Sequence, residues 1–252
     1  MGTITRRTLI RSGLAAAAGV GGLAAAARLA ERYGLIPPDS GTLYGIGETL
    51  TYASHRIVTP SASLAREFSR RDISSVAPVN GPAPESDAYL QLLDDDFERW
   101  RLAIEGLVTR PSSFSLAELK RLPVRSQITM HTCEEGWSFI AEWTGVLLSE
   151  VLTITGVNAR ARYVVFFPYD QWWDSLELEE ALHPQTLLAW SMNGHDLSLD
   201  HGAPLRLRVP RQLGYKSVKF LSRIRVVDTL EDIGQGLGSA SAEAGYAWYA
   251  GI

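Results

Sequence analysis

The chain has 252 residues, an apolar fraction of 46%, a charged fraction of 21% and a formal net charge of −4. This length and composition are those of a globular protein with one large domain or two small ones, and the acidic balance argues against nucleic acid as its main partner. Because the chain has one cysteine, an internal disulfide framework is excluded.

The first thirty residues have the layout of an export signal. Arg6 and Arg7 precede an apolar run, Leu14–Leu29, that has no charge before Arg28. A paired arginine before such a run predicts a twin-arginine signal, a route that carries folded cargo. The run is short and rich in Ala and Gly for a membrane span of about 20 residues, so we expect cleavage in preference to retention as an anchor. Residues 1–30 therefore predict export to the periplasm or to the outer face of the cytoplasmic membrane.

Residues 31–64 are expected to form a linker. The cluster Pro37–Gly41 is rich in chain breakers, and the stretch up to Pro60 shows no long periodic pattern, with only a short helical possibility at His55–Val58. Further on, Asn80–Pro82 predicts a turn.

Short strands and short helices follow one another through the middle of the chain. The patterns predict strands at Phe97–Val108, Val124–Met130 and Arg162–Phe167, a short helix opened by the capping box Ser115–Glu118, and a helix over Val146–Thr155 with Gly156 as C-cap. Asn193-Gly194 is a strong signal for a two-residue β-hairpin. Since strands dominate and no internal repeat or persuasive domain boundary is visible, the pattern favours one β-rich domain with helices, of the mixed α+β class.

A polar, aromatic-walled loop surrounds Cys133, the only cysteine. A lone thiol is a buried spectator, a nucleophile or a metal ligand. His131, Glu134 and Glu135 crowd this thiol, and Gly136 allows a close approach of the backbone. Such a loop is more typical of a functional site than of a core.

A second polar cluster lies towards the C-terminus. His201–Pro210 alternates so that Arg206 and Arg208 face opposite to the apolar residues of the same stretch. The turn Gly214–Lys219 follows, and it combines glycine with two lysines. Backbone N–H groups and cations of this kind are suited to binding an anion such as a phosphate.

The two clusters resemble one known family. Cys133–Ser138, followed by Trp143–Val146, and His201–Pro210, followed by Gly214–Lys219, are similar to the two signatures of the molybdopterin-binding domain of the sulfite oxidase superfamily. The likeness is nearest to the bacterial branch that contains the catalytic subunit of the periplasmic methionine sulfoxide reductase. The resemblance implies a single β-rich α+β domain of that type over residues 65–252, with a Mo-molybdopterin cofactor.

The resemblance also implies roles for individual residues. In this family the cysteine thiolate binds molybdenum directly, so Cys133 is the expected metal ligand and catalytic residue, and a soft thiolate suits such a metal. Pro168 stands where relatives have a polar cofactor contact, with Asp170 as the alternative, and His201 stands where this branch has Asn. Asn80 is explained equally well as a plain turn residue. The expected cofactor-binding residues are Asn80, His131, His201, Arg206, Ser217, Val218 and Lys219.

The chemistry implied by the resemblance is two-electron redox with an oxygen atom moved to or from a small substrate or a sulfoxide group. Trp137, Trp172 and Trp173 are candidate N–H donors to the substrate, although the last two equally suit a covering of the core. The sequence has no Cys-x-x-Cys-His haem motif. We therefore expect a separate electron-transfer partner, such as a membrane cytochrome or a quinone-linked subunit.

Two other classes of protein remain open. The first is a thiol enzyme with Cys133 as nucleophile and His131, His183 or His201 as base, which requires a lowered thiol pKa and no metal. The second is a non-catalytic exported binding protein on the same scaffold, which holds a ligand or a pterin without turnover. The presence of Cys133 argues against the second class, because loss of the metal ligand is the simplest mark of a retired enzyme.

Overall fold

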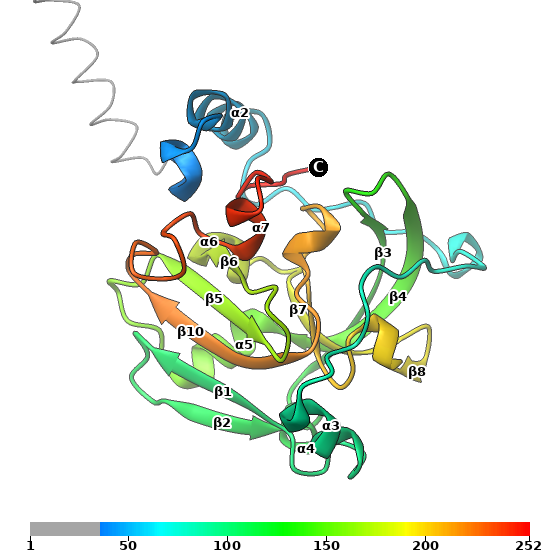
Figure 1. The fold of residues 1–252 in the computed structure, drawn as a ribbon. Helices are drawn as coiled ribbons and strands as arrows, with labels where there is room; N and C mark the ends of the chain where they lie inside the picture. The colour runs from blue at the N-terminus through cyan, green and yellow to red at the C-terminus, as the bar shows by residue number, and fades with distance from the viewer. Residues whose placement is uncertain (1–35) are drawn as a thin grey trace, which may run out of the picture.

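The structure is a computed structural model that describes residues 36–252, so the expected export signal at residues 1–30 lies outside the described residues. The described chain forms two five-stranded sheets with short helices around them (Figure 1). Sheets dominate the structure, which confirms the β-rich α+β fold class expected from the sequence.

The first sheet is mixed. In spatial order its strands are β2 (Ser112–Ser115), β1 (Arg101–Gly106), β10 (Leu221–Val227), β5 (Tyr163–Pro168) and β6 (Asp174–Glu177). β1 and β10 pair in parallel, whereas the other neighbouring strands are antiparallel. The parallel pair thus joins an early segment of the domain to a late one.

The second sheet is antiparallel. Its strands are β3 (Val124–Thr132), β4 (Ser138–Leu147), β7 (Leu187–Met192) and β8 (His195–Asp196), with β9 (Arg206–Arg208) also paired to β7. Asn193 and Gly194 connect β7 to β8 with φ values of 53° and 82°. Positive φ at both central residues is what a type I′ turn requires, so the predicted hairpin is confirmed.

Short helices lie before, between and after these strands. They are α3 (Asp87–Leu93), α4 (Leu116–Leu119), α5 (Leu148–Thr155), α6 (Leu178–Ala181), α7 (Ala240–Glu243), η2 (Arg70–Asp72), η3 (Leu199–His201) and η4 (Gly214–Lys216). The capping box is confirmed, because the Ser115 hydroxyl accepts from the Glu118 N–H at 3.2 Å. α5 begins two residues later than expected, since β4 continues to Leu147 and pairs there with β7. Gly156 ends α5 with a φ of 70°, as a C-cap glycine should.

The segment before residue 65 contains η1 (Pro38–Gly41) and a helix of 14 residues, α2 (Gly45–Val58). The sequence had indicated only a short helical segment here. α2 packs through Tyr52 against Trp248 and Tyr249 of the C-terminal segment, with ring centroids 6.2 and 5.1 Å apart. No helix within residues 36–252 has the length and hydropathy that a membrane crossing requires.

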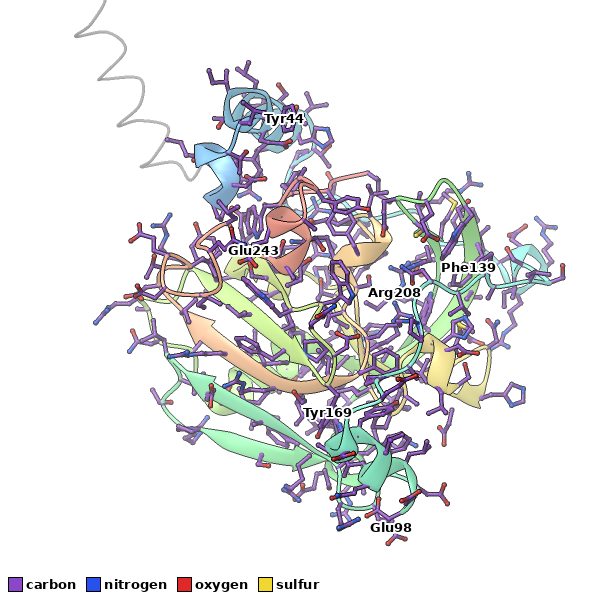
Figure 2. All side chains as sticks on the ribbon, in the orientation of Figure 1. Tyr44, Glu98, Phe139, Tyr169, Arg208 and Glu243 are labelled. Atoms are coloured by element: carbon purple, nitrogen blue, oxygen red, sulfur yellow. The ribbon has the colours of Figure 1, made fainter. Side chains whose placement is uncertain are left out.

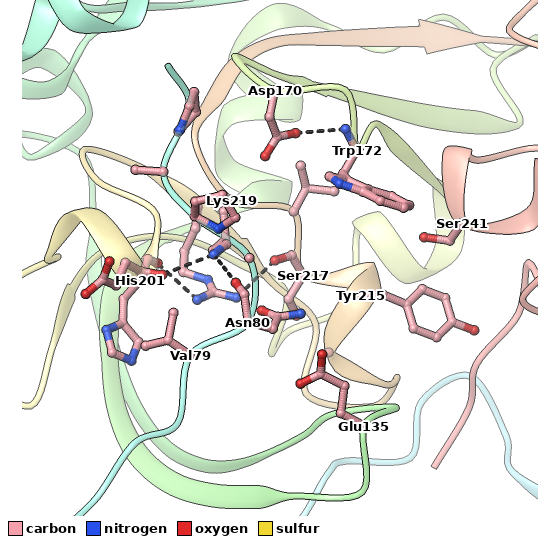
Figure 3. Close-up of a pocket in the computed structure, with 18 of the residues that line it drawn as sticks. Val79, Asn80, Glu135, Asp170, Trp172, His201, Tyr215, Ser217, Lys219 and Ser241 are labelled. Carbon is pink, nitrogen blue, oxygen red and sulfur yellow. Dashed lines mark hydrogen bonds between the residues drawn. The ribbon is translucent and has the colours of Figure 1, made fainter. Parts of the chain in front are cut away.

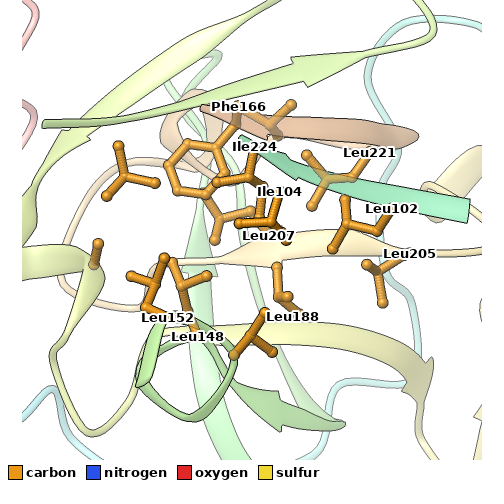
Figure 4. Packing of buried hydrophobic residues seen from close by; sticks show 14 of the residues in the cluster. Leu102, Ile104, Leu148, Leu152, Phe166, Leu188, Leu205, Leu207, Leu221 and Ile224 are labelled. Carbon is orange, nitrogen blue, oxygen red and sulfur yellow. The ribbon is translucent and has the colours of Figure 1, made fainter. Parts of the chain in front are cut away.

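The main core lies between the two sheets (Figure 4). Its members are fully or almost fully buried, and they include Leu102, Ile104, Phe166 and Ile224 from the first sheet, Leu188 and Leu207 from the second, and Leu148 and Leu152 from α5. Each such side chain contributes about 1.5–3 kcal/mol by leaving water. This packing holds the sheets in place and so fixes the loops that connect their strands.

Candidate active site

A cavity of about 880 Å³ opens among the loops at one end of the sheets (Figure 3). Its walls come from the extended stretch Pro78–Ser86, the β3–β4 turn, the loop after β5, the segment from η3 into β9, and η4 with the turn that follows it. Pockets that bind small molecules or cofactors have volumes of about 300–1,000 Å³. The cavity is therefore of a size to hold an organic cofactor together with a small substrate.

The structure brings the expected cofactor-binding residues together at this cavity. Its lining includes all seven of them, namely Asn80, His131, His201, Arg206, Ser217, Val218 and Lys219. Cys133 is 3% exposed and lies behind the wall, while its neighbours Glu134 and Glu135 line the cavity. The two clusters identified in the sequence thus meet in space.

Cys133 occupies the tight turn between β3 and β4. Its N–H donates to the Trp137 carbonyl at 2.9 Å, and its carbonyl accepts from the Gly136 N–H at 3.2 Å. Gly136 has a φ of +90°, a left-handed conformation that favours glycine. The thiol donates to the Glu134 carboxylate at 3.3 Å, and burial together with the neighbouring carboxylates raises the pKa of Cys133 to about 11. Because a nucleophilic thiol needs a lowered pKa, this environment argues against the thiol enzyme.

Two buried arginines beside the cavity have no acidic partner among residues 36–252. Arg206 and Arg208 are 4% and 0% exposed, and their Cζ atoms lie 5.0 and 5.2 Å from the ring centroid of Trp143. Arg206 donates to the carbonyls of His201 and Ser217, each at 3.0 Å. Desolvation lowers the pKa of Arg206 to about 10 and, with repulsion from Arg206, that of Arg208 to about 9.

The acceptors around Arg208 are also neutral. Its guanidinium donates to the Met130 carbonyl at 2.6 Å and to the Ser217 hydroxyl at 3.3 Å. Among the hydrogen bonds of the two arginines within residues 36–252, no acceptor is a carboxylate. Burying a cation without a counter-charge is costly. The arrangement therefore favours an anion in the cavity, which Arg206 lines.

Lys219 adds a third cation to the same wall. Its Nζ donates to the backbone carbonyls of Asn80 at 2.7 Å and Asp200 at 3.1 Å. Burial, with repulsion from Arg206, lowers the pKa of Lys219 to about 8. Asn80 thus takes part through its backbone in holding Lys219, while the residue as a whole lines the cavity.

The surroundings of two histidines on the wall disfavour their charged forms. Burial, together with the nearby arginines, lowers the pKa of His131 well below its usual value, and that of His201 as well. His131 packs against the rings of Trp137 and Trp143, and its Nδ1 has no hydrogen-bond partner within the described chain. A Cβ on Gly214 would lie 2.7 Å from the His131 Nε2. Glycine at this position therefore lets η4 close onto the imidazole ring.

The two lysines of the Gly214–Lys219 turn have different surroundings. Lys219 lines the cavity, whereas Lys216 is 1% exposed and forms an ion pair with the equally buried Asp174 of β6. The Lys216 Nζ also lies 5.0 Å from the ring centroid of Trp248. Sequence reasoning missed this pair, because the two residues are far apart in the chain and nothing local links them.

The loop after β5 places Trp172 and Trp173, and likewise Pro168 and Asp170, in different surroundings. Trp172 is 51% exposed and lines the cavity, whereas Trp173 stacks on Phe167, with ring centroids 6.3 Å apart, and covers a small core. Asp170 lines the cavity, and Pro168 ends β5 outside the lining. Trp172 therefore remains a candidate substrate contact, and of Pro168 and Asp170 only Asp170 lines the cavity, so it remains the candidate for the polar contact.

Comparison with known proteins identifies the family. The profile of the oxidoreductase molybdopterin binding domain matches residues 89–233, which is more than half of the chain. The chain belongs to this family. The matched span contains Cys133, Arg206 and Lys219, whereas Asn80 lies before it. The family, and with it the class of molybdopterin-dependent oxidoreductase, is the one that the two sequence signatures implied.

Two of the similar proteins are named as subunits of protein-methionine-sulfoxide reductases. The chain is 36% identical over 156 residues to the putative protein-methionine-sulfoxide reductase subunit YedZ1 of Azospira oryzae, covering 62% of this chain and 57% of that protein. It is 37% identical over 152 residues to the protein-methionine-sulfoxide reductase catalytic subunit MsrP of Xanthomonas campestris pv. campestris, covering 53% and 46%. The chain thus spans about half the length of the curated relatives it matches.

Among solved structures, the sulfane dehydrogenase SoxCD from Paracoccus pantotrophus aligns with a TM-score of 0.49 and 27% identity, over 52% of this chain and 38% of that chain.

The residues at the cavity fit the cofactor of this family. Molybdopterin carries a phosphate, and the buried guanidinium of Arg206 and the Lys219 ammonium are cations without a carboxylate hydrogen-bond partner in the described chain. The polar ring of the cofactor needs neutral donors and acceptors, and the rings of His131 and His201, whose surroundings disfavour the charged form, offer them. Behind the same wall lies Cys133, a soft sulfur donor.

Proposed function

We propose that this protein is an exported molybdenum-cofactor-dependent oxidoreductase that transfers an oxygen atom in a two-electron reaction, with a sulfoxide as its substrate. The observation that carries the proposal is the pair of buried guanidiniums next to a cavity of about 880 Å³; the hydrogen-bond acceptors of these guanidiniums within the described residues are carbonyl and hydroxyl oxygens. Such a site is suited to an anionic cofactor, and the chain belongs to a family of molybdopterin-binding oxidoreductases.

Each group of residues has its own task in this proposal. Arg206, Ser217 and Lys219 bind the cofactor phosphate, while Asn80 and His201 contact the pterin. Cys133 supplies its thiolate to molybdenum, which requires loss of the proton that the thiol shares with Glu134. Metal binding favours this deprotonation, because a coordinated thiol is held as thiolate. When bound, the cofactor supplies the two-electron redox chemistry and the oxygen-atom transfer.

The walls of the cavity support a neutral substrate. Glu85, Glu134, Glu135 and Asp170 line it together with the cations Arg206 and Lys219. Once the cofactor phosphate occupies the two cations, the remaining carboxylates would repel a small anion such as sulfite but not an uncharged sulfoxide. Reduction of a sulfoxide consumes two electrons and two protons and releases a sulfide and water. The relatives whose names describe methionine sulfoxide reductase subunits are consistent with this direction.

The electrons would come from a separate partner, for which a membrane cytochrome or quinone-linked subunit remains the expectation from the sequence. Export by the twin-arginine route would suit a protein that takes up its cofactor before it crosses the membrane. The basis of this step is the sequence of residues 1–30, with Arg6 and Arg7 ahead of Leu14–Leu29.

The test begins with the full chain expressed in a host that makes molybdopterin. We expect molybdenum and pterin in equimolar amounts with the wild-type chain, and reduction of a methionine sulfoxide, but not oxidation of sulfite, with a reduced dye as electron donor. Cys133→Ser should keep the pterin and lose turnover. Loss of a charge-assisted hydrogen bond in Arg206→Met should weaken pterin retention by about 10- to 100-fold.

The matched control is Arg225→Met, which removes an exposed arginine from β10 and should retain the pterin. A folded wild-type chain without pterin would contradict the cofactor proposal. Pterin without turnover on any substrate would favour the non-catalytic binding protein, and turnover without metal would favour the thiol enzyme.

A further inference from the structure

The outer face of α2 presents the apolar side chains of Ile46, Leu50, Ile57 and Val58, and Leu43 in the turn before the helix continues this surface. These side chains are 83%, 64%, 74%, 78% and 91% exposed, respectively. Within α2, Ile46, Leu50 and Ile57 recur at intervals of four and seven residues, so they lie on one side of the helix. An exposed apolar surface of this kind usually marks an interaction site.

Contacts on its inner side fix α2 with this face outward. Tyr52 is 2% exposed, and its hydroxyl donates to the Glu177 carboxylate. Arg56 forms ion pairs with Glu177 at 3.0 Å and Glu179 at 2.8 Å, and Tyr52 also packs on the ring of Tyr249. Because these contacts tie the inner side to the body, the helix does not turn its apolar face inward.

Besides its apolar residues, α2 exposes the small polar residues Thr51 and Ser54 but no charged side chain. Glu48, His55 and Arg56 are only partly exposed, and Arg56 is paired. A helix that faces water normally places charged residues on its outer face. The outer face of α2 is therefore suited to an apolar medium, and Tyr44, labelled at this end of the molecule in Figure 2, is also exposed.

We propose that the outer face of α2 lies on the lipid surface of a membrane. The argument for lipid is the neighbouring sequence: the apolar run Leu14–Leu29 ends 13 residues (30–42) before Leu43, so the membrane holds this run in a chain that has not been cleaved or that keeps the run as an anchor. An extended chain of that length reaches at most about 45 Å, so a membrane that holds this run is within reach of α2. The face has no exposed charge, so burial of apolar area drives the contact and salt has little effect on it.

This contact also orients the cavity. Tyr246 lines the cavity and lies two residues before Trp248, whose ring contacts Tyr52 of α2. Figure 1 shows α2, the C-terminal segment and the β3–β4 turn towards the same end of the molecule. Seating α2 on lipid therefore turns this end of the protein, with the wall formed by Tyr246, towards the membrane.

The test uses the full chain with vesicles of zwitterionic phosphatidylcholine. A polarity-sensitive dye is attached to Leu50→Cys or Ile57→Cys, and to Val124→Cys as the control. Val124 is 52% exposed at the end of β3 opposite to the Cys133 turn. Cys133 is buried and should escape labelling, which the unsubstituted chain verifies.

On chains that float with the vesicles, we expect the emission of both α2 dyes to move to shorter wavelengths, in low and high salt alike, and the Val124 dye to keep its emission in water. An α2 dye that stays in water on floating chains overturns the proposal, and so does a chain that fails to float. A shift that appears without vesicles and grows with protein concentration would assign the face to a second copy of the chain. A shift that needs anionic lipid and disappears in salt would contradict an apolar contact.

Discussion

Replacing Asp174 by Asn would remove the counter-charge of a buried lysine. Asp174 and Lys216 form an ion pair in which the side chains are 2% and 1% exposed. Lys216 belongs to η4 and directly precedes Ser217, which lines the cavity. The ion pair thus fixes η4 to β6, and its loss should affect both stability and the cofactor wall.

The expected loss of unfolding free energy follows from the two protonation states available to a buried lysine that has no counter-charge. An ammonium that keeps its charge without a partner costs about 3–5 kcal/mol. A lysine that instead gives up its proton, from a reference pKa of about 10.4, costs about 4.6 kcal/mol at pH 7. Both states give a loss of about 3–5 kcal/mol, which is a large part of a typical stability of about 5–15 kcal/mol.

The state in which the buried lysine is deprotonated also predicts that the free energy of unfolding depends on pH. A neutral lysine in the folded chain binds no proton, whereas the same lysine in the unfolded chain binds one until the pH approaches its reference pKa. Because the unfolded state then binds more protons, the free energy of unfolding of Asp174→Asn should rise with pH, by up to about 1.4 kcal/mol per unit. The wild-type chain, in which Asp174 supplies the counter-charge, lacks this contribution, whereas the contribution of Lys219, whose pKa is lowered to about 8, is common to both chains.

Urea denaturation at pH 7 and pH 9 measures these quantities for the wild type, Asp174→Asn, Lys216→Met and the double variant. Burial already raises the pKa of Asp174 to about 6, so Lys216→Met also strands a group that is poorly suited to carry charge there. Each single variant should lose about 3–5 kcal/mol, and the double variant should recover most of it, since two neutral groups remain. Additive single losses would refute the reasoning.

The exposed pair Arg160–Asp228, at 2.5 Å, is the control, and Asp228→Asn should cost at most about 1 kcal/mol.

Two further predictions concern the cavity wall. The pKa of Lys219 is lowered to about 8 by burial and by Arg206. The affinity of the cofactor-free protein for sulfate, measured by calorimetry, should therefore fall as the pH rises through 8. Lys219→Met should bind sulfate more weakly at pH 6 and lose this pH dependence, and a variant that keeps the wild-type pH profile would contradict the prediction. Gly214→Ala places a Cβ 2.7 Å from the His131 Nε2, so in thermal unfolding it should lose about 1–3 kcal/mol and retain less pterin. Gly47→Ala meets nothing within 4 Å and should show neither effect.

Local chemistry made several features predictable from the sequence. The turn at Asn193-Gly194, the capping box at Ser115 and the C-cap at Gly156 depend on residues next to one another in the chain, and the structure has all three. The meeting of the Cys133 loop with the Gly214–Lys219 turn was predictable only through the family resemblance. Composition and periodicity alone do not say which loops of a β-rich domain share a cavity.

The features that were missed depend on tertiary contacts. A surface helix is recognised by polar residues on its outer side, and α2 places apolar residues there, so its periodic pattern was hidden. Its inner side is stabilised instead by Tyr52 and Arg56, through groups far along the chain. The pair of Asp174 and Lys216 was missed for the same reason, because each residue alone resembles an ordinary surface charge.

The arginines of β9 show that the two faces of a strand can be predicted correctly while the surroundings of one face are not. The pattern correctly separates Arg206 and Arg208 from the apolar Leu205, Leu207 and Val209, yet all five residues are at most 4% exposed. Alternation divides two faces of a strand but does not distinguish water from a polar interior. Here the second face meets Trp143 and a set of carbonyl oxygens. Both guanidiniums have therefore lost their hydration during folding, so an anion that enters the cavity does not have to remove it. Such preorganisation would favour tight binding of an anion by Arg206, which lines the cavity, with Arg208 buried behind it.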